Sequence, residues 1–278
     1  MSRGGDYAGQ GVVITGAASG LGAALAELFA SAGARLALLD IDAERVTAKA
    51  AEFADRGVEA IGLAVDVSDP AAVAAAAARV GSELGDCAVL CANVGVQQFG
   101  ALDRFTADDW AWMLSVNVMG VVNTVAAFLP LIRASAGERH ILLTGSASCL
   151  VPTVRLGAYV ASKCAVVGYG EVLRLELAEE GINVTMLMPA GMPTRHLESS
   201  VAARPAGLGP APFDPTDRDA VIAGSAGMAE MMAPEQAVRN LIEALSERPA
   251  YFITHGGYRD VLLARHAALM RAFDRAST

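Results

Sequence analysis

The chain has 278 residues, a formal net charge of −9, and 54% hydrophobic but only 5% aromatic residues. An acidic chain without a Lys/Arg cluster repels phosphate backbones, so nucleic-acid binding is not expected. The most apolar stretch, residues 116–132, is interrupted by Asn117, Asn123 and Thr124, which favours a buried helix over a bilayer span. With no signal-peptide pattern at the N-terminus, we expect a soluble cytoplasmic protein with one domain over residues 1–278 and no membrane partner.

Short apolar runs alternate with segments of helical spacing from the first strand onward. The expected strands are Gly11–Thr15, Arg35–Leu39, Val58–Val65, Cys87–Ala92, His140–Thr144, Ile182–Met188 and Tyr251–Thr254. The expected helices are Gly20–Ala32, Asp42–Arg56, one that begins at Pro70, Thr106–Arg133, Ala158–Glu180, Pro234–Arg248 and Tyr258–Arg275. This alternation predicts an α/β fold with a doubly wound parallel sheet of about seven strands and helices on both faces.

Two helix starts carry their own signals. Asp69 before Pro70 is a capping residue followed by a first-turn proline, and Thr106 with Asp109 three residues later resembles a capping box. Residues 191–232 lack clear periodicity and contain five prolines between 193 and 215. A segment of this length is usually functional. We therefore expect a substrate loop or lid here, with a solvated insertion as the alternative.

A glycine-rich turn lies between the first strand and the first helix. Gly16 allows a tight turn, Gly20 lets backbone N–H groups approach a ligand, and Gly22 allows close packing of the helix on the sheet. The free N–H groups of the helix N-terminus suit a pyrophosphate. The residues expected to contact it are Gly16, Ser19, Gly20, Leu21 and Gly22.

Acidic residues end the second and third strands. Asp40 can accept hydrogen bonds from both adenosine ribose hydroxyls and would repel a 2′-phosphate, which favours NAD over NADP as the cofactor. The alternative, that Asp40 caps the next helix, is weakened because Asp42 can do so. Asp66, with Val67 beside it, could bind the adenine, or Asp66 could cap the following turn.

Tyr159 and Lys163 are one helical turn apart on an expected helix, so both project from one face. An ammonium group near a phenol favours the phenolate and is expected to lower the pKa of Tyr159 from about 10. Such a phenol can exchange a proton with an alcohol oxygen.

Together these motifs make the chain resemble the short-chain dehydrogenase/reductase family over residues 10 to 195. The resemblance rests on the Rossmann-type glycine-rich turn, Thr15 to Gly22, and on six further residues: Asn93, Gly95, Asn117, Ser146, Tyr159 and Lys163. The resemblance implies that Ser146 orients the substrate oxygen, that Lys163 binds the nicotinamide ribose, and that Asn117 holds a water in a proton relay. A structural contact in a buried helix is the alternative for Asn117.

Two segments depart from the family pattern. The family's N-N-A-G is here Ala92 to Gly95, which keeps Asn93, expected at the sheet centre, and Gly95. The segment after the sixth strand runs from Pro189 to Thr194, and Thr194 can still hydrogen-bond the nicotinamide carboxamide. The resemblance implies binding of NAD by Asn93, Gly95, Pro189 and Thr194 in addition to the catalytic residues.

The family implies an NAD-dependent oxidoreductase acting on a secondary alcohol or ketone, as a homodimer or homotetramer. Apolar residues of the lid favour a hydrophobic substrate, with packing of the lid onto the body as the alternative for each of them: Leu197, Val201, Leu208, Phe213, Val221, Ile222, Met228, Met231 and Met232. Arg195 and His196 are expected at the surface, with contact to a polar group of the substrate as the alternative. The rival readings are an NADP-linked carbonyl reductase, a sugar-nucleotide epimerase, whose glycine spacing differs, and a non-enzymatic NAD-binding sensor or scaffold. The cysteines show no metal spacing and are expected in the interior as thiols.

Overall fold

The computed structural model describes residues 7–211, 214–224 and 231–276. Its strands are β1 (Gly11–Thr15), β2 (Arg35–Asp40), β3 (Ala60–Ala64), β4 (Val89–Ala92), β5 (His140–Thr144), β6 (Asn183–Met188) and β7 (Tyr251–Ile253). Its α-helices are α1 (Gly20–Ser31), α2 (Ala43–Asp55), α3 (Pro70–Glu83), α4 (Ala107–Leu114), α5 (Gly120–Ala134), α6 (Ala147–Leu150), α7 (Gly157–Leu177), α8 (His196–Ala202), α9 (Pro215–Gly224), α10 (Pro234–Val238), α11 (Leu241–Ser246) and α12 (Arg259–Ala276). Short 3₁₀ turns occupy Leu102–Arg104 and Ala206–Leu208.

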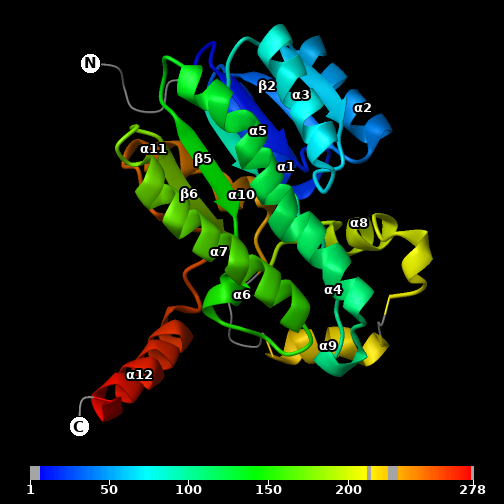
Figure 1. Cartoon of the computed structure of the whole chain (residues 1–278), viewed down its shortest axis with the longest axis vertical. Helices are drawn as coiled ribbons and strands as arrows, with labels where there is room; N and C mark the ends of the chain where they lie inside the picture. Colours follow the sequence, from blue (N-terminus) through cyan, green and yellow to red (C-terminus); the bar gives the residue numbers. More distant parts are fainter. Residues whose placement is uncertain (1–6, 212–213, 225–230, 277–278) are drawn as a thin grey trace.

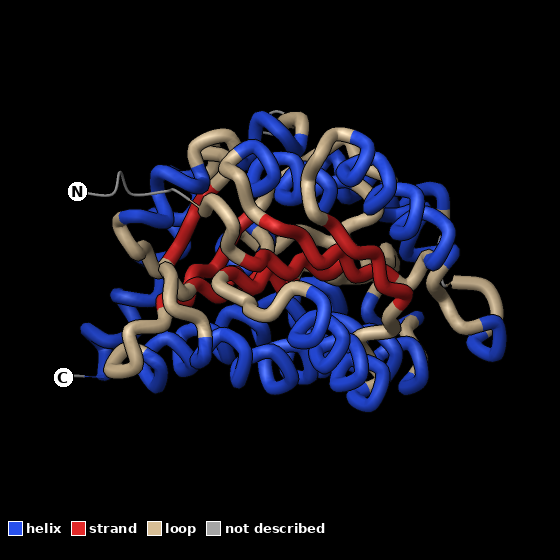
Figure 2. Tube along the Cα trace, turned by 90° about the horizontal axis from the view of Figure 1, so that it is seen from above, coloured by secondary structure: helices blue, strands red, loops and turns tan. Residues whose placement is uncertain are grey.

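The seven strands of the described chain form one parallel sheet in the order β3-β2-β1-β4-β5-β6-β7. Helices cover both faces, as the view from above shows (Figure 2). Successive residues of a strand point to opposite faces. Val13 therefore packs with Phe128 of α5 on one face, whereas Val12 packs with Phe29 of α1 on the other. The expected doubly wound α/β fold is confirmed, and its order reverses between β1 and β4, where such sheets bind ligands.

Several expected elements differ in detail; the strand expected from Cys87 begins at Val89, and the helix expected to end at Glu180 ends at Leu177. The expected helix Pro234–Arg248 is wrong, because α10 ends at Val238 and α11 begins after Asn240, whose backbone lies at φ −103° and ψ 9°. Asparagine competes with the helix by local hydrogen bonding and favours such breaks. The expected helix Thr106–Arg133 contains a π-helical segment, Ser115–Met119, between α4 and α5. The strand expected from Val58 begins only at Ala60.

The run Ala107–Ala134, which comprises α4, the π segment and α5, is long and apolar enough to cross a bilayer by length and composition. In this fold its inner residues Val121, Val125, Phe128 and Ile132 are buried against the sheet and its neighbours. A helix whose apolar side chains fill a protein core passes the same compositional test. We therefore interpret this run as a core helix.

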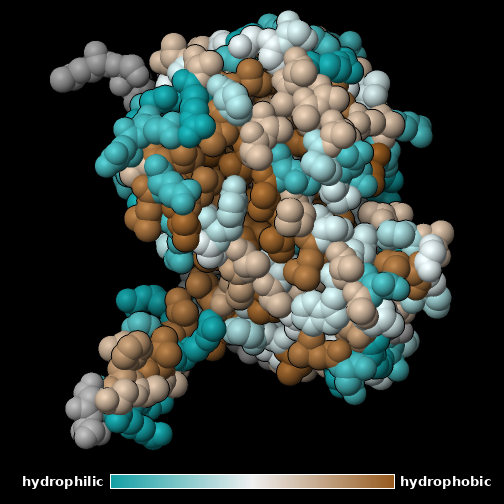
Figure 3. All heavy atoms as spheres, viewed as in Figure 1, coloured by the Kyte–Doolittle hydropathy of each residue, from teal (hydrophilic) through white to brown (hydrophobic). Residues whose placement is uncertain are grey.

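The last helix, α12, extends away from the body at the lower left of Figure 1. None of its described residues is buried, and Leu269 and Phe273 are 57% and 61% exposed. Brown apolar surface is visible along it (Figure 3). Its first turns touch the body, where Leu262 packs near Tyr258 and Arg265 donates to the carbonyl oxygens of Cys149 and Leu150.

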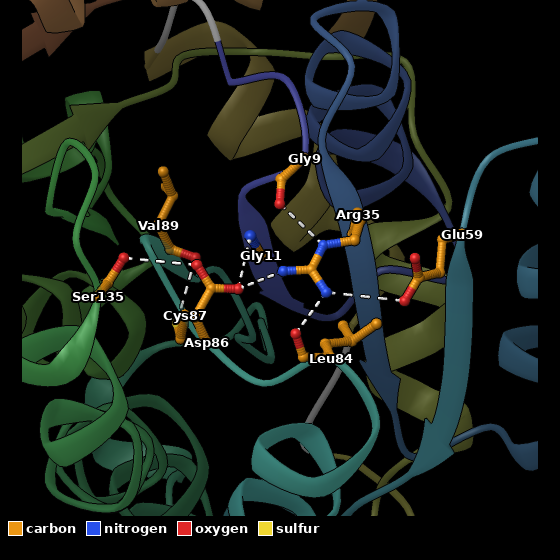
Figure 4. A network of polar contacts seen from close by, with 9 residues as sticks. All are labelled: Gly9, Gly11, Arg35, Glu59, Leu84, Asp86, Cys87, Val89 and Ser135. Carbon is orange, nitrogen blue, oxygen red and sulfur yellow. Dashed lines mark hydrogen bonds and ion pairs between the residues drawn. The ribbon is translucent and has the colours of Figure 1, made fainter.

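A polar network holds the amino ends of β1, β2 and β4 together, at the edge opposite the glycine-rich turn (Figure 4). Oδ1 of Asp86 accepts hydrogen bonds from the backbone N–H of Gly11 at 3.1 Å and from Arg35 at 2.7 Å. Arg35 also donates to the carbonyl oxygens of Gly9 and Leu84. Removing Asp86 would leave several partly buried donors without an acceptor.

We therefore expect Asp86→Ala to lower the free energy of unfolding by about 2 kcal/mol, the scale of losing hydrogen bonds to a charged acceptor. Urea denaturation measures this. The control is Glu59→Ala, because Glu59 is exposed and lies 3.7 Å from the same arginine, so its loss should cost less than about 1 kcal/mol. Equal costs for the two variants would contradict the assigned role of the network.

Candidate active site

The glycine-rich turn has the backbone shape of a phosphate cradle. Gly16 and Gly20 have φ values of 66° and 54°, and a Cβ at Gly22 would lie 1.9 Å from the carbonyl oxygen of Gly16. Ser19 is the N-cap of α1, yet its side chain makes no capping hydrogen bond, and the first turn contains no acidic residue. The N-terminal N–H groups and the positive end of the helix dipole are thus available to an anion, as a pyrophosphate requires.

Asp40 connects this turn to the end of β2. Its Oδ2 accepts from the backbone N–H of Ala18 at 3.0 Å, and its Oδ1 accepts from that of Asp42 at 3.1 Å. The cap of α2 is Asp42, which accepts from the N–H of Arg45. A carboxylate has about four acceptor sites, so Asp40 is fixed in place and still has lone pairs for two ribose hydroxyls.

The residues expected around the adenine have other contacts in the chain. Asp66 is exposed and accepts from the N–H and hydroxyl of Ser68 at 2.9 and 2.7 Å. The cap of α3 is Asp69. Val67 is buried, and its carbonyl oxygen accepts from Asn123 at 3.0 Å. Asp66 therefore closes the turn before α3, and adenine binding by Asp66 and Val67 stays a prediction.

Three side chains gather at the carboxyl ends of β5 and the start of α7. Ser146, Tyr159 and Lys163 are 8%, 8% and 2% exposed, and Ser146 contacts the Tyr159 hydroxyl by a hydrogen bond. The Lys163 ammonium donates to the carbonyl oxygen of Thr144 at 2.8 Å. Ser148, the alternative to Ser146, donates to the Ser146 hydroxyl at 2.8 Å and so supports it.

The expected depression of the Tyr159 pKa is wrong for the chain alone. Burial raises the pKa of Tyr159 to about 12, although the hydrogen bond with Ser146 acts to lower it. Burial also lowers the pKa of Lys163 to about 8. The physical reason is that desolvation disfavours the charged form of both groups. At neutral pH the site therefore holds a protonated phenol, which is a proton donor, next to an ammonium group.

Asn117 lies in the π-helical segment and is fully buried. Its Oδ1 accepts from the N–H of Val96 at 2.7 Å, and its Nδ2 donates to the Val96 carbonyl and to the hydroxyl of Ser162, each at 2.9 Å. These contacts give Asn117 the structural role that the sequence left open. π-Bulges often occur at functional sites, and a relay role for Asn117 stays a prediction.

Asn93 and Gly95 follow β4 and face the same edge. Asn93 donates to the carbonyl oxygen of Thr15 at 3.2 Å and accepts from the hydroxyl of Thr144 at 3.0 Å, so it links β1 to β5. A Cβ at Gly95 would lie 2.9 Å from the Lys163 ammonium. A side chain at this position would force the Lys163 ammonium to shift.

Pro189 and Thr194 bring the start of the lid to the same place. The Pro189 carbonyl oxygen accepts from the N–H of Ala147 at 2.8 Å, directly after Ser146. A Cβ at Gly20 would meet the Thr194 side chain at 3.4 Å. The chain thus brings the glycine-rich turn, the end of β6 and the catalytic group to one edge of the sheet.

His196, for which a surface position was expected and contact with a polar substrate group was the alternative, lies beside the catalytic tyrosine. Its ring lies edge-on to Tyr159 with 6.1 Å between ring centroids, and its Nε2 is 3.0 Å from the carbonyl oxygen of Gly95. Its neighbour Arg195 is exposed and pairs with Glu198, as expected. Burial, together with the Lys163 charge, lowers the pKa of His196 to about 4.

This histidine predicts a pH dependence of stability. The folded pKa of His196, about 4, is below the ordinary value of 6.5, so the unfolded chain binds more protons in this window. Its contribution is complete above pH 6.5 and is lost as the pH falls toward 4. We expect the free energy of unfolding to fall over this window by at least about 1 kcal/mol more in the wild type than in His196→Gln. Parallel urea-denaturation curves for the two proteins would contradict the burial of the neutral ring.

The lid, residues 191–232, turns several apolar side chains toward Tyr159. Leu197, Leu208 and Val221 pack against its cluster, which includes Phe99 and Trp112. The side chains of Val201, Ile222 and Met231 are exposed, Met232 is half-buried, and Phe213 and Met228 lie outside the described residues.

Ion pairs fix the described part of the lid at two points, one of them a buried pair and the other a buried carboxylate held by two partly exposed arginines. Arg204 contacts Asp109 of α4 at 2.6 Å, and their side chains are 7% and 3% exposed. Asp217 of α9, 1% exposed, contacts Arg104 at 2.6 Å and Arg155 at 3.3 Å. The lid is therefore a fixed wall of the site in this structure.

The described side chains do not indicate a metal site or a thiol-based site. The described part of the chain holds no group of three or more metal-ligating side chains. Cys87, Cys91 and Cys149 are buried free thiols, as expected, whereas Cys164 is exposed, which corrects the expectation of an interior position.

Comparison with known proteins agrees with this geometry. The model of the short chain dehydrogenase family matches residues 10–205. The chain is 30% identical over 267 residues to the C alpha-dehydrogenase of Sphingobium sp. SYK-6, covering 95% of this chain and 87% of that protein. It is 36% identical over 182 residues to the D-threitol dehydrogenase of Mycolicibacterium smegmatis, covering 65% and 69% of the two chains. A short chain dehydrogenase/reductase of Burkholderia phymatum, solved in complex with NAD, superposes with a TM-score of 0.86 at 33% identity over 96% of each chain.

Proposed function

Because the chain belongs to the short chain dehydrogenase family of oxidoreductases, we propose that it transfers a hydride between NAD and a hydrophobic secondary alcohol or ketone, with Tyr159 as general acid/base. The observation that carries this proposal is the buried contact of Ser146 with Tyr159, next to Lys163, at the sheet edge where the phosphate cradle lies. No other group in the described chain combines a proton donor, a neighbouring cation and an anion cradle.

The residues present fit a nicotinamide dinucleotide, since the turn at Gly16 and Gly20 leaves Cβ-free backbone at the positive end of α1. When bound, the nicotinamide supplies the hydride chemistry. The residues proposed to hold it are Gly16, Ser19, Gly20, Leu21, Gly22, Asp40, Asp66, Val67, Asn93, Gly95, Tyr159, Lys163, Pro189 and Thr194.

The catalytic residues act on the substrate oxygen. Ser146 and Tyr159 hydrogen-bond that oxygen. Tyr159 donates its proton to the oxygen in reduction, and it accepts the hydroxyl proton of the alcohol in oxidation. Lys163 binds ribose hydroxyls and, as a cation, stabilises the phenolate once that proton has moved. The apolar residues packed around Tyr159, such as Phe99 and Leu156, exclude water from the reacting atoms.

The carboxylate of Asp40 supports NAD over NADP. We expect Asp40→Ser to raise the dissociation constant of NAD by about tenfold or more, because hydrogen bonds to a charged acceptor are lost, and to tighten NADP binding. Titration of both cofactors measures the two constants. The control is Asp42→Ser, which removes the same charge two residues away and keeps a capping side chain on α2. Tighter NADP than NAD binding by the wild type would overturn the assignment.

The apolar wall supports a hydrophobic substrate. Leu197, Leu208 and Val221 of the lid join Phe99 and Trp112 around the catalytic tyrosine. NAD reduction measured across a library of secondary alcohols tests this. Activity confined to small charged sugars would contradict it.

We also propose a homodimer or homotetramer built on α4, α5 and α7. These helices, together with the π-helical segment between α4 and α5, expose Leu114, Met119, Val172 and Leu175, and Leu175 is 68% exposed. Such apolar groups gain from burial in an interface. Analytical ultracentrifugation tests this, and a monomer at micromolar concentration would contradict it.

A further inference from the structure

Two buried polar atoms near the catalytic group have no hydrogen-bond partner. Tyr258 is 3% exposed and its hydroxyl is unpartnered, and His255 is 2% exposed with an unpartnered Nε2. Both residues lie in the short connection between β7 and α12. Buried polar side-chain atoms are nearly always hydrogen-bonded, so such atoms point to a ligand or a water.

These two side chains stand beside the segments that carry Ser146 and the start of the lid. Tyr258 packs against Ala147, the residue after Ser146, and Ala190 packs against the same cluster. The ring of His255 hydrogen-bonds the backbone of Gly191 and lies 2.5 Å from the Thr254 hydroxyl through Nδ1. Ala147 directly follows Ser146, and consecutive Cα atoms are about 3.8 Å apart, so Tyr258 packs against the residue next to the serine proposed to orient the substrate oxygen.

Packing of Tyr258 and hydrogen bonds from the helix that follows it hold this segment against α6. Val151, just after α6, packs against the ring, and Arg265 of α12 donates to the carbonyl oxygens of Cys149 and Leu150 at 2.9 and 2.7 Å. The start of α12 is thereby fastened to α6. A side chain held in this way is preorganised, so a ligand need not order it on binding.

We propose that Tyr258 and His255 form a polar subsite that binds a second oxygen of the substrate. The substrate class is then a hydrophobic secondary alcohol or ketone that carries a further neutral oxygen, such as a hydroxyl, an ether or a carbonyl. This inference rests on the proposed function and narrows it.

The charge state of the pair favours a neutral oxygen over an anionic one. Burial raises the pKa of Tyr258 to about 12, so its hydroxyl remains a donor at neutral pH. Burial lowers the pKa of His255, so the imidazole remains uncharged. Neither group offers a positive charge to a carboxylate or a phosphate, which would be costly to bury unpaired.

The test compares 1-phenylethanol with its ortho, meta and para ring-hydroxylated forms in the wild type and in Tyr258→Phe, with NAD in excess. We expect the wild type to prefer at least one hydroxylated isomer by about tenfold or more in kcat/KM, because a site built to bind a hydroxyl rejects the analogue without it. In Tyr258→Phe this ratio should fall toward one. The midpoint of thermal unfolding should stay unchanged or rise, because the deleted hydroxyl has no partner within the protein.

Tyr169→Phe is the matched control. Tyr169 lies half-buried on α7, packs against the main core cluster, and should keep the wild-type ratio when its hydroxyl is removed. Activity on all four alcohols without a preference, a preference that survives Tyr258→Phe, or a lowered unfolding midpoint in that variant would each overturn the subsite while leaving the proposed function intact. A wild type that binds NAD but oxidises none of the four would overturn both.

Discussion

Replacing Tyr159 by phenylalanine is expected to lower kcat/KM for a secondary alcohol by about a thousandfold, within the range that general acid/base groups contribute. The phenol is buried, its pKa is raised to about 12, and Ser146 hydrogen-bonds it, so its loss removes the group that is placed to exchange a proton with the substrate oxygen. Cofactor binding should change much less, because the phosphate cradle and Asp40 remain. Steady-state turnover and NAD titration on the same preparation separate the two effects.

Tyr169→Phe serves as the control here also, because it deletes a phenol hydroxyl from the same helix, and it should keep wild-type turnover. Unchanged turnover in Tyr159→Phe would remove the proposed mechanism. Wild-type NAD binding without turnover on any alcohol would instead favour a sensor or scaffold that binds the cofactor.

Replacing Arg204 by methionine is expected to lower the free energy of unfolding by about 3 to 5 kcal/mol, because it leaves the carboxylate of Asp109 buried and unpaired. Arg204 contacts Asp109 at 2.6 Å, donates to Gln98 at 2.8 Å, and lies over the Trp112 ring. The hydrogen bonds from Thr106 and Arg204 hold the pKa of Asp109 below its usual value despite burial, which acts to raise it.

The control for this variant is Arg195→Met. Arg195 lies directly before α8 and Arg204 lies shortly after it, but Arg195 pairs with Glu198 at the surface, where the two side chains are 50% and 64% exposed. Exposed pairs contribute about 0 to 1 kcal/mol, so its cost should be small. Chemical denaturation of both variants measures the difference. Similar small losses of unfolding free energy in both variants would show that the lid does not depend on its buried ion pair. A KM that rises only in Arg204→Met would show that the fixed wall matters for substrate binding.

Much of the fold follows from local signals in the sequence. The strands are apolar runs that close at polar residues, as at Asp40, and helix starts carry their caps, as in the box formed by Thr106 and Asp109. Alternating strands and helices then leave a parallel sheet as the arrangement that buries both faces. Local signals did not reveal the π-helical segment around Asn117, because that segment depends on tertiary hydrogen bonds to Val96 and Ser162.

The site was predictable where spacing within one element fixes the geometry, as for Tyr159 and Lys163 on one face of α7. The role of a site residue was not predictable where it depends on how deeply the folded chain buries that residue. His196 is polar and lies in a proline-rich segment, yet α8 turns it against Tyr159. The Tyr159 pKa rises because desolvation outweighs the lowering effect of the hydrogen bond with Ser146, and desolvation depends on how the lid and α4 pack.

The most direct measurement is single-turnover reduction of NAD by a hydrophobic secondary alcohol, followed across pH with hydrogen and with deuterium at the carbinol carbon. We expect reduced cofactor to form at a rate that deuterium lowers and that rises with pH as Tyr159 loses its proton. In Tyr159→Phe this rate should collapse. Tight NAD binding without reduction by any alcohol, or reduction indifferent to the loss of this hydroxyl, would contradict the proposed mechanism.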